Sequence, residues 1–368
     1  MSAALRRETP PDQPATRALR KEVRELLERG GIAVLPTETV YGLAARADDE
    51  AALQRLLALK SRPDGKGLTW HVGSRAALES FDELAGIAGR LAERHWPGPL
   101  TLVLSGVPEA LKSIALEGWT GVRFPAHAAL ASLLDFAPFP IVMTSANRSG
   151  AAPAVEASAA EATFGDEVDL YVDSGRCSLS ESSVVLKVGP GRFEVLREGL
   201  LELDALKRSA GLNIGFVCTG NTCRSPMAET LARAVLGRRL ATPGENQVVP
   251  PEIFGFRIGS AGVYAGTGSP ASEHAVTVMG ENGLDLSCHG SQPATPELLR
   301  DWDRVYCLTS SHREALVANL PPSRSRHIAL LDPDGRDVPD PIGGSLDDYR
   351  ACARSIERSL EQRVEEWV

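Results

Sequence analysis

The stretch Ile214-Gly-Phe-Val-Cys218-Thr-Gly-Asn-Thr-Cys-Arg224-Ser225-Pro-Met-Ala-Glu229 contains a short apolar run, a compact loop and the start of a helical pattern. Five residues separate Cys218 from Arg224, a length that lets the loop wrap one tetrahedral anion. The backbone N–H groups of such a loop point inward, and the following helix adds its positive end. The stretch therefore predicts a strand, an anion-binding loop and a helix, with a cysteine where the loop begins.

The side chains of this loop suit chemistry on phosphorus. Cysteine reacts as the thiolate, and a helix N-terminus with a nearby guanidinium favours that form of Cys218. Arg224 can hold two phosphate oxygens in a planar fork. Ser225 is placed to donate its hydroxyl to the sulfur, while Gly220 and Asn221 permit the positive φ angles of a tight loop. The predicted phosphate-loop residues are Thr219, Gly220, Asn221, Thr222, Cys223 and Ser225.

A second interpretation of the same motif is a buried cysteine at a strand end beside a surface arginine. The strand predicted before the loop and the helix predicted after it favour the catalytic interpretation. In that interpretation Cys218 is the nucleophile and Arg224 binds the phosphoryl group.

The whole chain has the length and composition of two globular domains. At 368 residues it exceeds the size at which one core usually keeps growing. The formal net charge of −9 comes without a basic patch, so we expect no tight direct binding to nucleic acid. Residues 1–16, rich in Pro, Thr and Arg, are predicted to form a disordered tail.

The cysteine pattern and the termini indicate a cellular compartment. Six cysteines follow no disulfide-scaffold spacing, and the N-terminus lacks an apolar signal segment. No stretch reaches the ~20 apolar residues that span a bilayer. We therefore expect a cytoplasmic protein without a membrane partner, and we identify no dedicated set of metal ligands in the sequence.

The second half alternates short apolar strands with helical patterns. Strands are expected over 213–217, 256–260, 305–308 and 328–331, and helices near 226–237, 272–283, 310–319 and 346–364. This alternation predicts a small, doubly wound parallel sheet with helices on both faces. The Cys218 loop then lies at the carboxyl end of the first strand, where open α/β sheets place their ligands.

The first half begins with a helical pattern over Ala18–Arg29, a Gly30-Gly31 stop and a buried strand over Ile32–Leu35. Polar groups then recur at expected strand ends and turns, where binding groups concentrate. Four separated cations could converge on a polyphosphate, namely Lys60, Arg62, Arg123 and Arg197. Three short neutral groups suit a small polar ligand or a nucleotide, namely Thr37, Ser145 and Asn147. Taken alone, each pattern also fits an ordinary solvated surface or turn.

In their order along the chain, these segments resemble the threonylcarbamoyl-AMP synthase family over about residues 17–200. The specific stretches are Pro36–Leu43, Lys60–Arg62, Trp96–Thr101 and Ser145–Asn147. The resemblance implies a twisted α/β open sheet with a large basic concavity. It also implies a reaction in which L-threonine, bicarbonate and ATP, the last with Mg²⁺, form threonylcarbamoyl-AMP and pyrophosphate for the t6A modification of tRNA. The tRNA threonylcarbamoyl transferase machinery is then an expected partner.

The resemblance also assigns binding residues by position. To threonine it assigns Thr37, His71, Arg123 and Ser145. To ATP it assigns Lys60, Arg62, Asn147, Ser182 and Arg197. Two segments depart from the family pattern: Lys66-Gly-Leu-Thr-Trp70 replaces the usual run before the histidine, and Ser182-Ser183-Val184 replaces a Ser-Thr-Val segment. The first departure puts the shape of the threonine pocket in question, whereas the second keeps a hydroxyl at both positions.

The second half resembles the low-molecular-weight protein phosphatase family over about residues 213–368. Besides the loop, the matching stretches are Ser260-Ala-Gly262 and Asp340-Pro341. In that family the aspartate of the Asp-Pro pair is the general acid, a role that the resemblance assigns to Asp340. The implied substrate is a phosphoprotein, and no cofactor is implied.

Several residues bear on which phosphoprotein is the substrate. A phosphotyrosine slot needs aromatic walls, yet Ile342 follows the Asp-Pro pair and Tyr264 supplies at most one ring. Thr222 is more polar than the aliphatic residue usual in tyrosine-directed members. The pattern looks most similar to the protein arginine phosphatase branch, so phosphoarginine is favoured over phosphotyrosine. Arsenate reduction is a third alternative, but it needs further thiols, and Cys288 and Cys307 lie on different expected elements.

The sequence thus predicts a tail over 1–16, a synthase-like domain over 17–200, a linker over 201–212 and a phosphatase-like domain over 213–368. The predicted function is a bifunctional synthase and cysteine-dependent phosphatase. A rival hypothesis makes the first half a non-catalytic nucleotide- or RNA-binding module. Cys223 keeps two interpretations, a reversible disulfide partner of Cys218 or a buried loop residue without a role.

Overall fold

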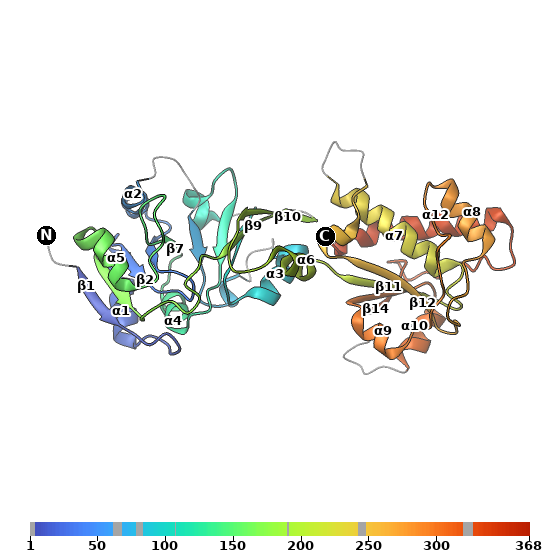
Figure 1. The fold of residues 1–368 in the computed structure, drawn as a ribbon, viewed down its shortest axis with the longest axis horizontal. Helices are drawn as coiled ribbons and strands as arrows, with labels where there is room; N and C mark the ends of the chain where they lie inside the picture. The colour runs from blue at the N-terminus through green and yellow to red at the C-terminus, as the bar shows by residue number, and fades with distance from the viewer. Residues whose placement is uncertain are drawn as a thin grey trace. The chain divides into compact units, whose positions relative to one another are not determined.

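The computed structural model describes residues 4–61, 68–78, 84–106, 108–189, 191–241, 248–318 and 327–368. The chain divides into two compact units, Met1–Leu206 and Lys207–Val368 (Figure 1). Each unit is built around its own sheet, so two domains are present. Among the described residues, no helix is long and apolar enough to cross a bilayer.

The first unit contains a ten-stranded mixed sheet with the order β1-β8-β2-β3-β7-β4-β6-β5-β9-β10. Its strands are β1 Leu5–Glu8, β2 Ala33–Leu35, β3 Gly42–Arg46, β4 Thr69–His71, β5 Leu100–Leu104, β6 Thr120–Arg123, β7 Ile141–Ser145, β8 Leu170–Asp173, β9 Val184–Gly189 and β10 Arg192–Arg197. The sheet contains both parallel pairs, such as β4 with β6, and antiparallel pairs, such as β3 with β7. The expected open α/β sheet is therefore confirmed.

Helices cover both faces of this sheet. They are α1 Arg17–Glu28, α2 Glu50–Leu59, α3 Gly86–His95, α4 Ala128–Phe136 and α5 Ala157–Phe164. Alternate residues of a strand point to opposite faces. Val34 of β2 accordingly packs in one buried cluster with residues of α2 and α5, whereas Leu35 packs in another with residues of α1 and α4.

The predicted helix over Ala18–Arg29 corresponds to α1, and its limits follow from the sequence. Thr16 caps the helix, because its hydroxyl oxygen accepts the Leu19 N–H at 3.2 Å. The residues buried along α1 recur at helical spacing, from Leu19 and Val23 to Leu26 and Leu27.

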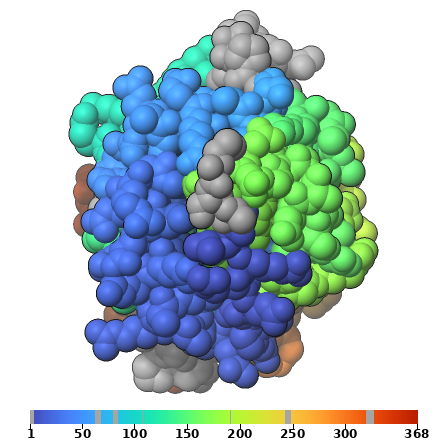
Figure 2. All heavy atoms as spheres, turned by 90° about the vertical axis from the view of Figure 1, so that its left-hand side faces the viewer, coloured from blue at the N-terminus to red at the C-terminus, as the bar shows by residue number. Residues whose placement is uncertain are grey.

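The prediction of a disordered tail over residues 1–16 is wrong within the described part of that tail. Leu5–Glu8 form β1, which pairs in parallel with Leu170–Asp173 of β8 and so becomes the edge strand of the sheet. Arg6 adds an ion pair with Asp173 at 2.5 Å. Figure 2 shows the first residues of the chain, in dark blue, lying against the green residues of this region. Composition could not reveal this pairing, because the partner strand is more than 160 residues away along the chain.

The second unit contains a parallel four-stranded sheet with the order β12-β11-β13-β14. Its strands are β11 Asn213–Cys218, β12 Arg257–Gly262, β13 Arg304–Cys307 and β14 Ile328–Leu330. Its helices include α7 Arg224–Leu240, α8 Glu273–Glu281, α9 Pro296–Asp301, α10 Ser310–Val317 and α12 Leu346–Arg363. The four expected strands and four expected helices are all present, and α9 is an addition to them.

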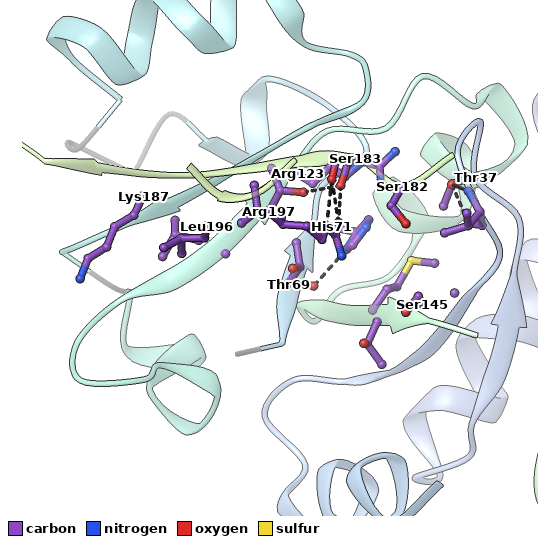
Figure 3. A pocket seen from close by; sticks show the side chains of 18 of the residues that line it. Thr37, Thr69, His71, Arg123, Ser145, Ser182, Ser183, Lys187, Leu196 and Arg197 are labelled. Atoms are coloured by element: carbon purple, nitrogen blue, oxygen red, sulfur yellow. Dashed lines mark hydrogen bonds between the residues drawn. The ribbon is translucent and has the colours of Figure 1, made fainter. Parts of the chain in front are cut away.

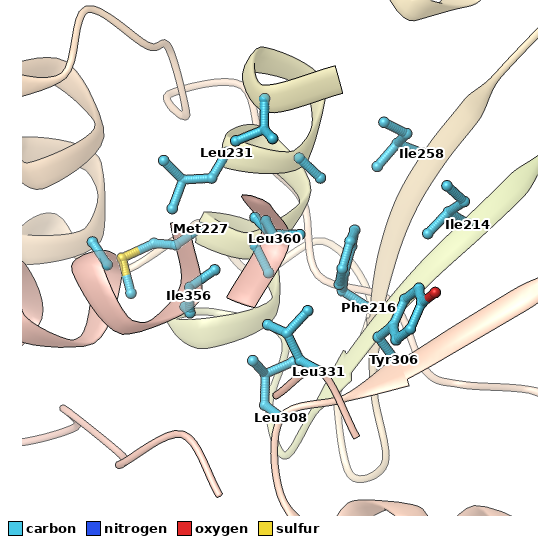
Figure 4. Close-up of a cluster of buried hydrophobic side chains, with 14 of the residues drawn as sticks. Ile214, Phe216, Met227, Leu231, Ile258, Tyr306, Leu308, Leu331, Ile356 and Leu360 are labelled. Carbon is cyan, nitrogen blue, oxygen red and sulfur yellow. The ribbon is translucent and has the colours of Figure 1, made fainter. Parts of the chain in front are cut away.

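Two buried clusters lie on opposite faces of this small sheet. The larger cluster packs Phe216 of β11 and Ile258 of β12 against Met227 of α7 and Ile356 of α12 (Figure 4). The smaller cluster packs Val217 of β11 with residues of α9 and α10. The fold is therefore doubly wound, as predicted from the alternation of strands and helices.

The predicted linker over 201–212 is helical over most of its length. Residues Leu203–Ala210 form α6, and the boundary between the two units falls within this helix. Leu206 and Ala210, four residues apart, are buried, which explains why the segment folds as a helix rather than an extended connection.

Candidate active sites

The predicted phosphate loop joins β11 to α7, with Cys218 as the last strand residue and Arg224 as the first helical one. Cys218 is buried, and its Sγ accepts the backbone N–H of Asn221 at 3.3 Å and lies 2.9 Å from Oγ of Ser225. Asn221 has the expected positive φ, 55°. The same expectation for Gly220 is wrong, since its φ lies outside the left-handed region. The loop surrounds the sulfur with donors, as the sequence predicts.

Ser225 has one hydroxyl proton and two acceptors within reach. Its Oγ lies 2.9 Å from the sulfur of Cys218 and 3.2 Å from the carbonyl oxygen of Ala261, and it accepts the side-chain N–H of Asn221 at 2.9 Å. When the sulfur is a thiol, it can donate to Ser225, which donates to Ala261. When the sulfur is a thiolate, the hydroxyl proton can turn to it. The Ser225 hydroxyl can thus donate to Ala261 when the sulfur is a thiol and to the sulfur when it is a thiolate.

Asn221 forms hydrogen bonds that join the loop to other segments of the domain. Its side-chain amide donates to Ser260 at 2.9 Å, its side-chain oxygen accepts the Gln292 N–H at 2.9 Å, and its carbonyl oxygen lies 2.7 Å from His289 Nε2. A Cβ on Gly262 would come within 2.9 Å of the Asn221 nitrogen, so only glycine fits there. Sequence reasoning missed His289 and Gln292, because only tertiary structure brings them to the loop.

The structure brings Asp340 and Arg224 together. Arg224 Nη2 donates to Asp340 Oδ2 at 2.5 Å, although 116 residues separate the two. The arginine side chain is 6% exposed, whereas that of the aspartate is 41% exposed. Arg224 Nη1 also donates to the Val338 carbonyl oxygen at 3.3 Å. The predicted anion-binding group and the predicted general acid therefore meet at the mouth of the loop.

Cys223 is buried in contacts on the far side of the loop. Its Sγ donates to Ser272 Oγ at 3.4 Å and lies 3.3 Å from the Tyr349 hydroxyl. These partners orient the thiol, so of the two interpretations of Cys223 the structure supplies observations for the buried loop residue. Cys288 is exposed, and Cys307 is fully buried with its pKa raised by burial to about 12.

Two exposed apolar side chains in this domain belong to segments that meet the loop. Tyr264 is 80% exposed and Ile342 is 70% exposed. The backbone N–H of Tyr264 donates to the backbone carbonyl oxygen of Thr219, and the backbone N–H of Ile342 donates to Asp340 Oδ1 at 3.2 Å. These contacts place one ring and one aliphatic side chain on backbone segments next to the predicted nucleophile and acid.

A histidine that the sequence did not single out also reaches the loop. His312, in the first turn of α10, is buried, and its Nε2 lies 2.9 Å from the hydroxyl oxygen of Thr219. Burial and the charge of Arg224 lower the pKa of His312 to about 4. The imidazole is therefore neutral at ordinary pH.

In the first unit, a cavity of about 780 Å³ opens beside strands β3, β4, β5, β6, β7, β9 and β10. Six of the predicted binding residues line it, namely Thr37, His71, Arg123, Ser145, Ser182 and Arg197 (Figure 3). Among the remaining predictions, Arg62 lies outside the described residues, as does Lys66 of the segment that departs from the family pattern.

Arg123 forms a buried ion pair in the wall of the cavity. Its Nη2 donates to Glu38 Oε1 at 2.7 Å and to Thr39 Oγ1 at 2.8 Å, and both charged side chains are only 6% exposed. Arg123 Nε and Glu38 Oε2 are buried and have no hydrogen-bond partner among the residues that the structure describes. Buried polar atoms normally have partners, so these two are exceptions in this part of the chain. Sequence reasoning missed Glu38, although it lies within the quoted Pro36–Leu43 run.

His71 presents an acceptor to the cavity. Its Nδ1 lies 3.0 Å from the carbonyl oxygen of Thr69, which can only accept, so Nδ1 carries the proton and Nε2 is an acceptor. Burial and the charge of Arg123 lower the pKa of His71 to about 3. The side chain is therefore a neutral hydrogen-bond acceptor.

Lys60 and Asn147 lie differently from the prediction that they contact ATP. Lys60 is fully buried, and its Nζ donates to the carbonyl oxygens of Ser145 and Asn147, both at 2.6 Å, and to Asn147 Oδ1 at 2.7 Å. The Asn147 amide donates to the carbonyl oxygens of Arg148 and Ala151. Neither residue lines the cavity, because their polar atoms hold the turn that follows β7.

Arg197 reaches the segment that departs from the family pattern. Its guanidinium donates to the Ser183 carbonyl oxygen at 2.8 Å and to Ser183 Oγ at 3.0 Å, and that hydroxyl lies 3.0 Å from Thr101 Oγ1. The neighbouring Ser182 lines the cavity without these contacts. At the cavity wall, Lys187 lies over the ring of Trp119 at 4.2 Å. The cavity thus combines cations and hydroxyl groups with the aromatic side chains of Tyr41 and Trp119.

Comparison with known proteins identifies each half. Residues 25–199 match the family described as Telomere recombination, and residues 213–367 match the family described as Low molecular weight phosphotyrosine protein phosphatase. The first half is similar to a threonylcarbamoyl-AMP synthase of Pyrococcus abyssi, 34% identical over 188 residues, which cover 50% of this chain and 55% of that protein. The chain therefore spans about half the length of this relative.

Two further comparisons agree. A solved structure of a P. abyssi Sua5 variant is 27% identical, with a TM-score of 0.50, over 58% of this chain and 71% of that one. A protein-arginine-phosphatase of Geobacillus stearothermophilus is 36% identical over 155 residues, 41% of this chain and 92% of that protein. This chain therefore belongs to the low-molecular-weight phosphatase family through residues 213–367, and its residues 25–199 form a domain of the threonylcarbamoyl-AMP synthase family.

Proposed function

We propose that the first domain is a threonylcarbamoyl-AMP synthase, which makes threonylcarbamoyl-AMP and pyrophosphate from L-threonine, bicarbonate and ATP. The observation that carries this proposal is the single cavity that gathers Thr37, His71, Arg123 and Ser145. The positive charge of Arg123 suits a carboxylate, and Nε2 of His71 suits the hydroxyl or ammonium group of an amino acid. These groups fit threonine.

The remaining lining suits a nucleotide. Arg197 and Lys187 supply positive charge, and Ser182 supplies a hydroxyl, so phosphate oxygens have partners of opposite charge. ATP enters as its Mg²⁺ complex, whose phosphates provide metal ligands; among the described residues, no group of three His, Cys, Asp or Glu side chains adds a protein site. The amine of threonine and bicarbonate form a carbamate and release water; an oxygen of this carbamate then attacks the α-phosphorus of ATP, and pyrophosphate leaves. The domain contributes positioning and electrostatic stabilisation.

We further propose that the second domain is a cysteine-dependent phosphatase. The thiolate of Cys218 attacks phosphorus, and the bond from phosphorus to the leaving group breaks as Asp340 donates its proton to that group. Asp340 then removes a proton from water, which attacks the thiophosphate and releases inorganic phosphate and the thiolate. The contact of 2.5 Å between Asp340 and Arg224 supports these roles, because it places the acid beside the anion-binding group.

Phosphoarginine is proposed as the favoured substrate over phosphotyrosine. A planar phosphoguanidinium does not need the aromatic walls that a tyrosine ring would use. The exposed side chain after the Asp-Pro pair is Ile342, and Thr222 gives the loop a polar side chain. The similarity to a Geobacillus stearothermophilus protein-arginine-phosphatase supports this choice.

A pyrophosphate-release assay tests the synthase. We expect release from ATP that depends on both threonine and bicarbonate, and Arg123→Ala should abolish it. ATP binding without release in the folded protein would instead support the rival hypothesis of a non-catalytic nucleotide- or RNA-binding module.

A side-by-side assay on phosphoarginine and phosphotyrosine peptides tests the phosphatase. We expect faster turnover of the phosphoarginine peptide and none by Cys218→Ser. Faster turnover of the tyrosine peptide would favour the tyrosine phosphatase alternative. For arsenate reduction, the buried Cys307 and the exposed Cys288 do not form a pair of accessible thiols, so we expect none.

The remaining partners follow from these two activities. We propose that the product of the first domain passes to the tRNA threonylcarbamoyl transferase machinery and that the second domain acts on phosphoproteins. The six free cysteines support the proposal of a reducing cytoplasm.

A further inference from the structure

The contact between His312 and the phosphate loop is short and buried. His312 Nε2 lies 2.9 Å from Thr219 Oγ1, and its Nδ1 lies 2.8 Å from Oγ1 of Thr309, the residue that caps α10. Thr219 is the residue after the nucleophile in the loop. His312 therefore links the start of α10 directly to the phosphate loop.

The donors in this contact chain can be assigned from chemistry. A guanidinium only donates, so the Thr219 oxygen accepts from Arg224 Nη2, 3.5 Å away. The hydroxyl proton of Thr219 is then available to His312 Nε2. In the tautomer in which Nε2 accepts this proton, Nδ1 carries the ring proton and donates to Thr309. In this arrangement each group donates a hydrogen bond to the next one: Arg224 to Thr219, Thr219 to His312, and His312 to Thr309.

The charges around the imidazole keep this arrangement. Burial and the cation of Arg224 oppose protonation, while Asp340 and Asp337 favour it more weakly. The net effect lowers the pKa of His312 to about 4, so the ring is neutral at neutral pH and one of its nitrogens is an acceptor.

Arg224 loses its hydrogen bond to Asp340 when Asp340 turns to the leaving group, so its other hydrogen bonds must then hold the guanidinium in place. Asp340 is 41% exposed and must turn to the leaving group as general acid. The buried contacts that remain for Arg224 are the Val338 carbonyl oxygen and the Thr219 hydroxyl oxygen. The orientation of Thr219 then decides whether its lone pair faces the guanidinium.

We propose that His312 is a positioning residue of the phosphatase site: by accepting the Thr219 hydroxyl proton, it turns the Thr219 oxygen toward Arg224. This inference rests on the proposed phosphatase function. His312 does not touch the substrate in this scheme and acts only through Thr219.

A double-mutant cycle tests the proposal. Thr219→Val removes the hydroxyl at similar volume, and His312→Phe removes the acceptor. With p-nitrophenyl phosphate as substrate, we expect each single variant to lower kcat about tenfold, roughly the effect of one hydrogen bond, and the double variant to lower it no further. His312→Gln, whose amide can accept from Thr219 and donate to Thr309, should recover most of the activity. His327→Phe is the matched control, because His327 is an exposed histidine directly before β14.

Three outcomes would overturn the proposal. One is a double variant about a hundredfold slower, since the two effects would then be independent. Another is unchanged kcat in His312→Phe with only a lower melting temperature. The third is no recovery with His312→Gln. If His312→Phe does not fold, His312→Leu, which also lacks the ring acceptor, replaces it in the same cycle with Thr219→Val.

A binding measurement separates this inference from the proposed function. If the wild type hydrolyses no phosphate ester, the phosphatase proposal fails. Calorimetric titration of the same proteins with inorganic phosphate still reports on the loop. We expect about tenfold weaker phosphate binding in Thr219→Val and His312→Phe and no change in His327→Phe, whereas equal binding in all of them would overturn the positioning role.

Discussion

The phosphate loop and the synthase cavity both gather cations and hydroxyl groups, but the chain builds them over very different distances. Most of the loop is the contiguous run Cys218–Ser225, which supplies the partners of the sulfur, the Asn221 backbone N–H and the Ser225 hydroxyl. The cavity draws its side chains from positions between Thr37 and Arg197. A contiguous site can be recognised from spacing, whereas a dispersed site depends on the order of strands in the sheet. The predictions below test that difference.

The largest expected effect is at the nucleophile. Cys218→Ser should lower phosphatase turnover about 10⁴-fold or more, because the hydroxyl is a far weaker nucleophile than the thiolate. The same protein should keep full threonine-dependent pyrophosphate release, since the two sites lie in separate units. Parallel assays of both activities check this. A loss of both activities would contradict the independence of the sites.

The next largest effect is at the general acid. Asp340→Asn keeps a hydrogen-bond acceptor for Arg224 but cannot supply a proton, so kcat should fall about 10²–10⁴-fold. The loss should be smaller for p-nitrophenyl phosphate, whose leaving group needs little protonation, than for a phosphoarginine peptide. An equal loss on both substrates would argue against proton donation by Asp340.

The buried ion pair of the cavity should show its effect in stability. Glu38→Ala leaves the charge of Arg123 buried and unpaired, which should lower the free energy of unfolding of the first unit by about 3–5 kcal/mol. Urea unfolding monitored in the full chain measures this. The matched control is Glu167→Ala, which breaks the exposed pair with Arg148 and should cost under about 1 kcal/mol. Equal losses of unfolding free energy in Glu38→Ala and Glu167→Ala would show that burial does not strengthen the contribution of the Glu38 pair to stability.

The lowered pKa of His71 predicts a pH dependence. Its ordinary value is 6.5, and in the folded protein it is about 3. Between pH 6.5 and 3, His71 is protonated in the unfolded chain but neutral in the folded protein. Protonation therefore favours the unfolded chain, and the free energy of unfolding falls as pH drops from 6.5 toward 3. Above pH 6.5 His71 contributes no slope. Unfolding free energies of the wild type and His71→Gln across this range should diverge in that window, and an NMR titration of His71 near pH 6.5 would contradict the prediction.

The smallest expected effect concerns substrate choice. Ile342 is 70% exposed, so Ile342→Tyr should leave stability unchanged while adding a ring near Asp340. An added aromatic contact of about 1 kcal/mol would raise phosphotyrosine turnover relative to phosphoarginine roughly fivefold. Ratios of kcat/KM for matched peptides measure this shift. An unchanged ratio would indicate that Ile342 does not contact the substrate.

Several features were predictable because they depend on short-range pattern. The strand before Cys218, the helix after it and the donors around its sulfur follow from local spacing, and they are present. The capped helix α1 follows from Thr16 and the spacing of its apolar residues. Cavity-lining positions such as His71 and Ser182 were found through resemblance, not through spacing.

Other features depend on contacts between distant segments, and sequence reasoning missed or misplaced them. The edge strand β1 exists only because β8 offers it backbone partners. Lys60 was expected at ATP, yet the turn after β7 surrounds its ammonium group with oxygens. Glu38 and His312 carry no local signal, since each acquires its partner from a segment more than 80 residues away.

The sequence by itself determined that this chain has two α/β domains, a Cys218 anion loop and a set of polar residues typical of a nucleotide-using enzyme. The two domains and the loop follow from periodicity, backbone preferences and motif spacing, which act over a few residues, whereas the set of polar residues was recognised through its resemblance to a known family. Only the tertiary structure decided which polar atoms meet: Asp340 with Arg224, His312 with Thr219, and Glu38 with Arg123. The physical reason is that burial and charge pairing depend on which strands and helices become neighbours, and the folded sheet sets that order.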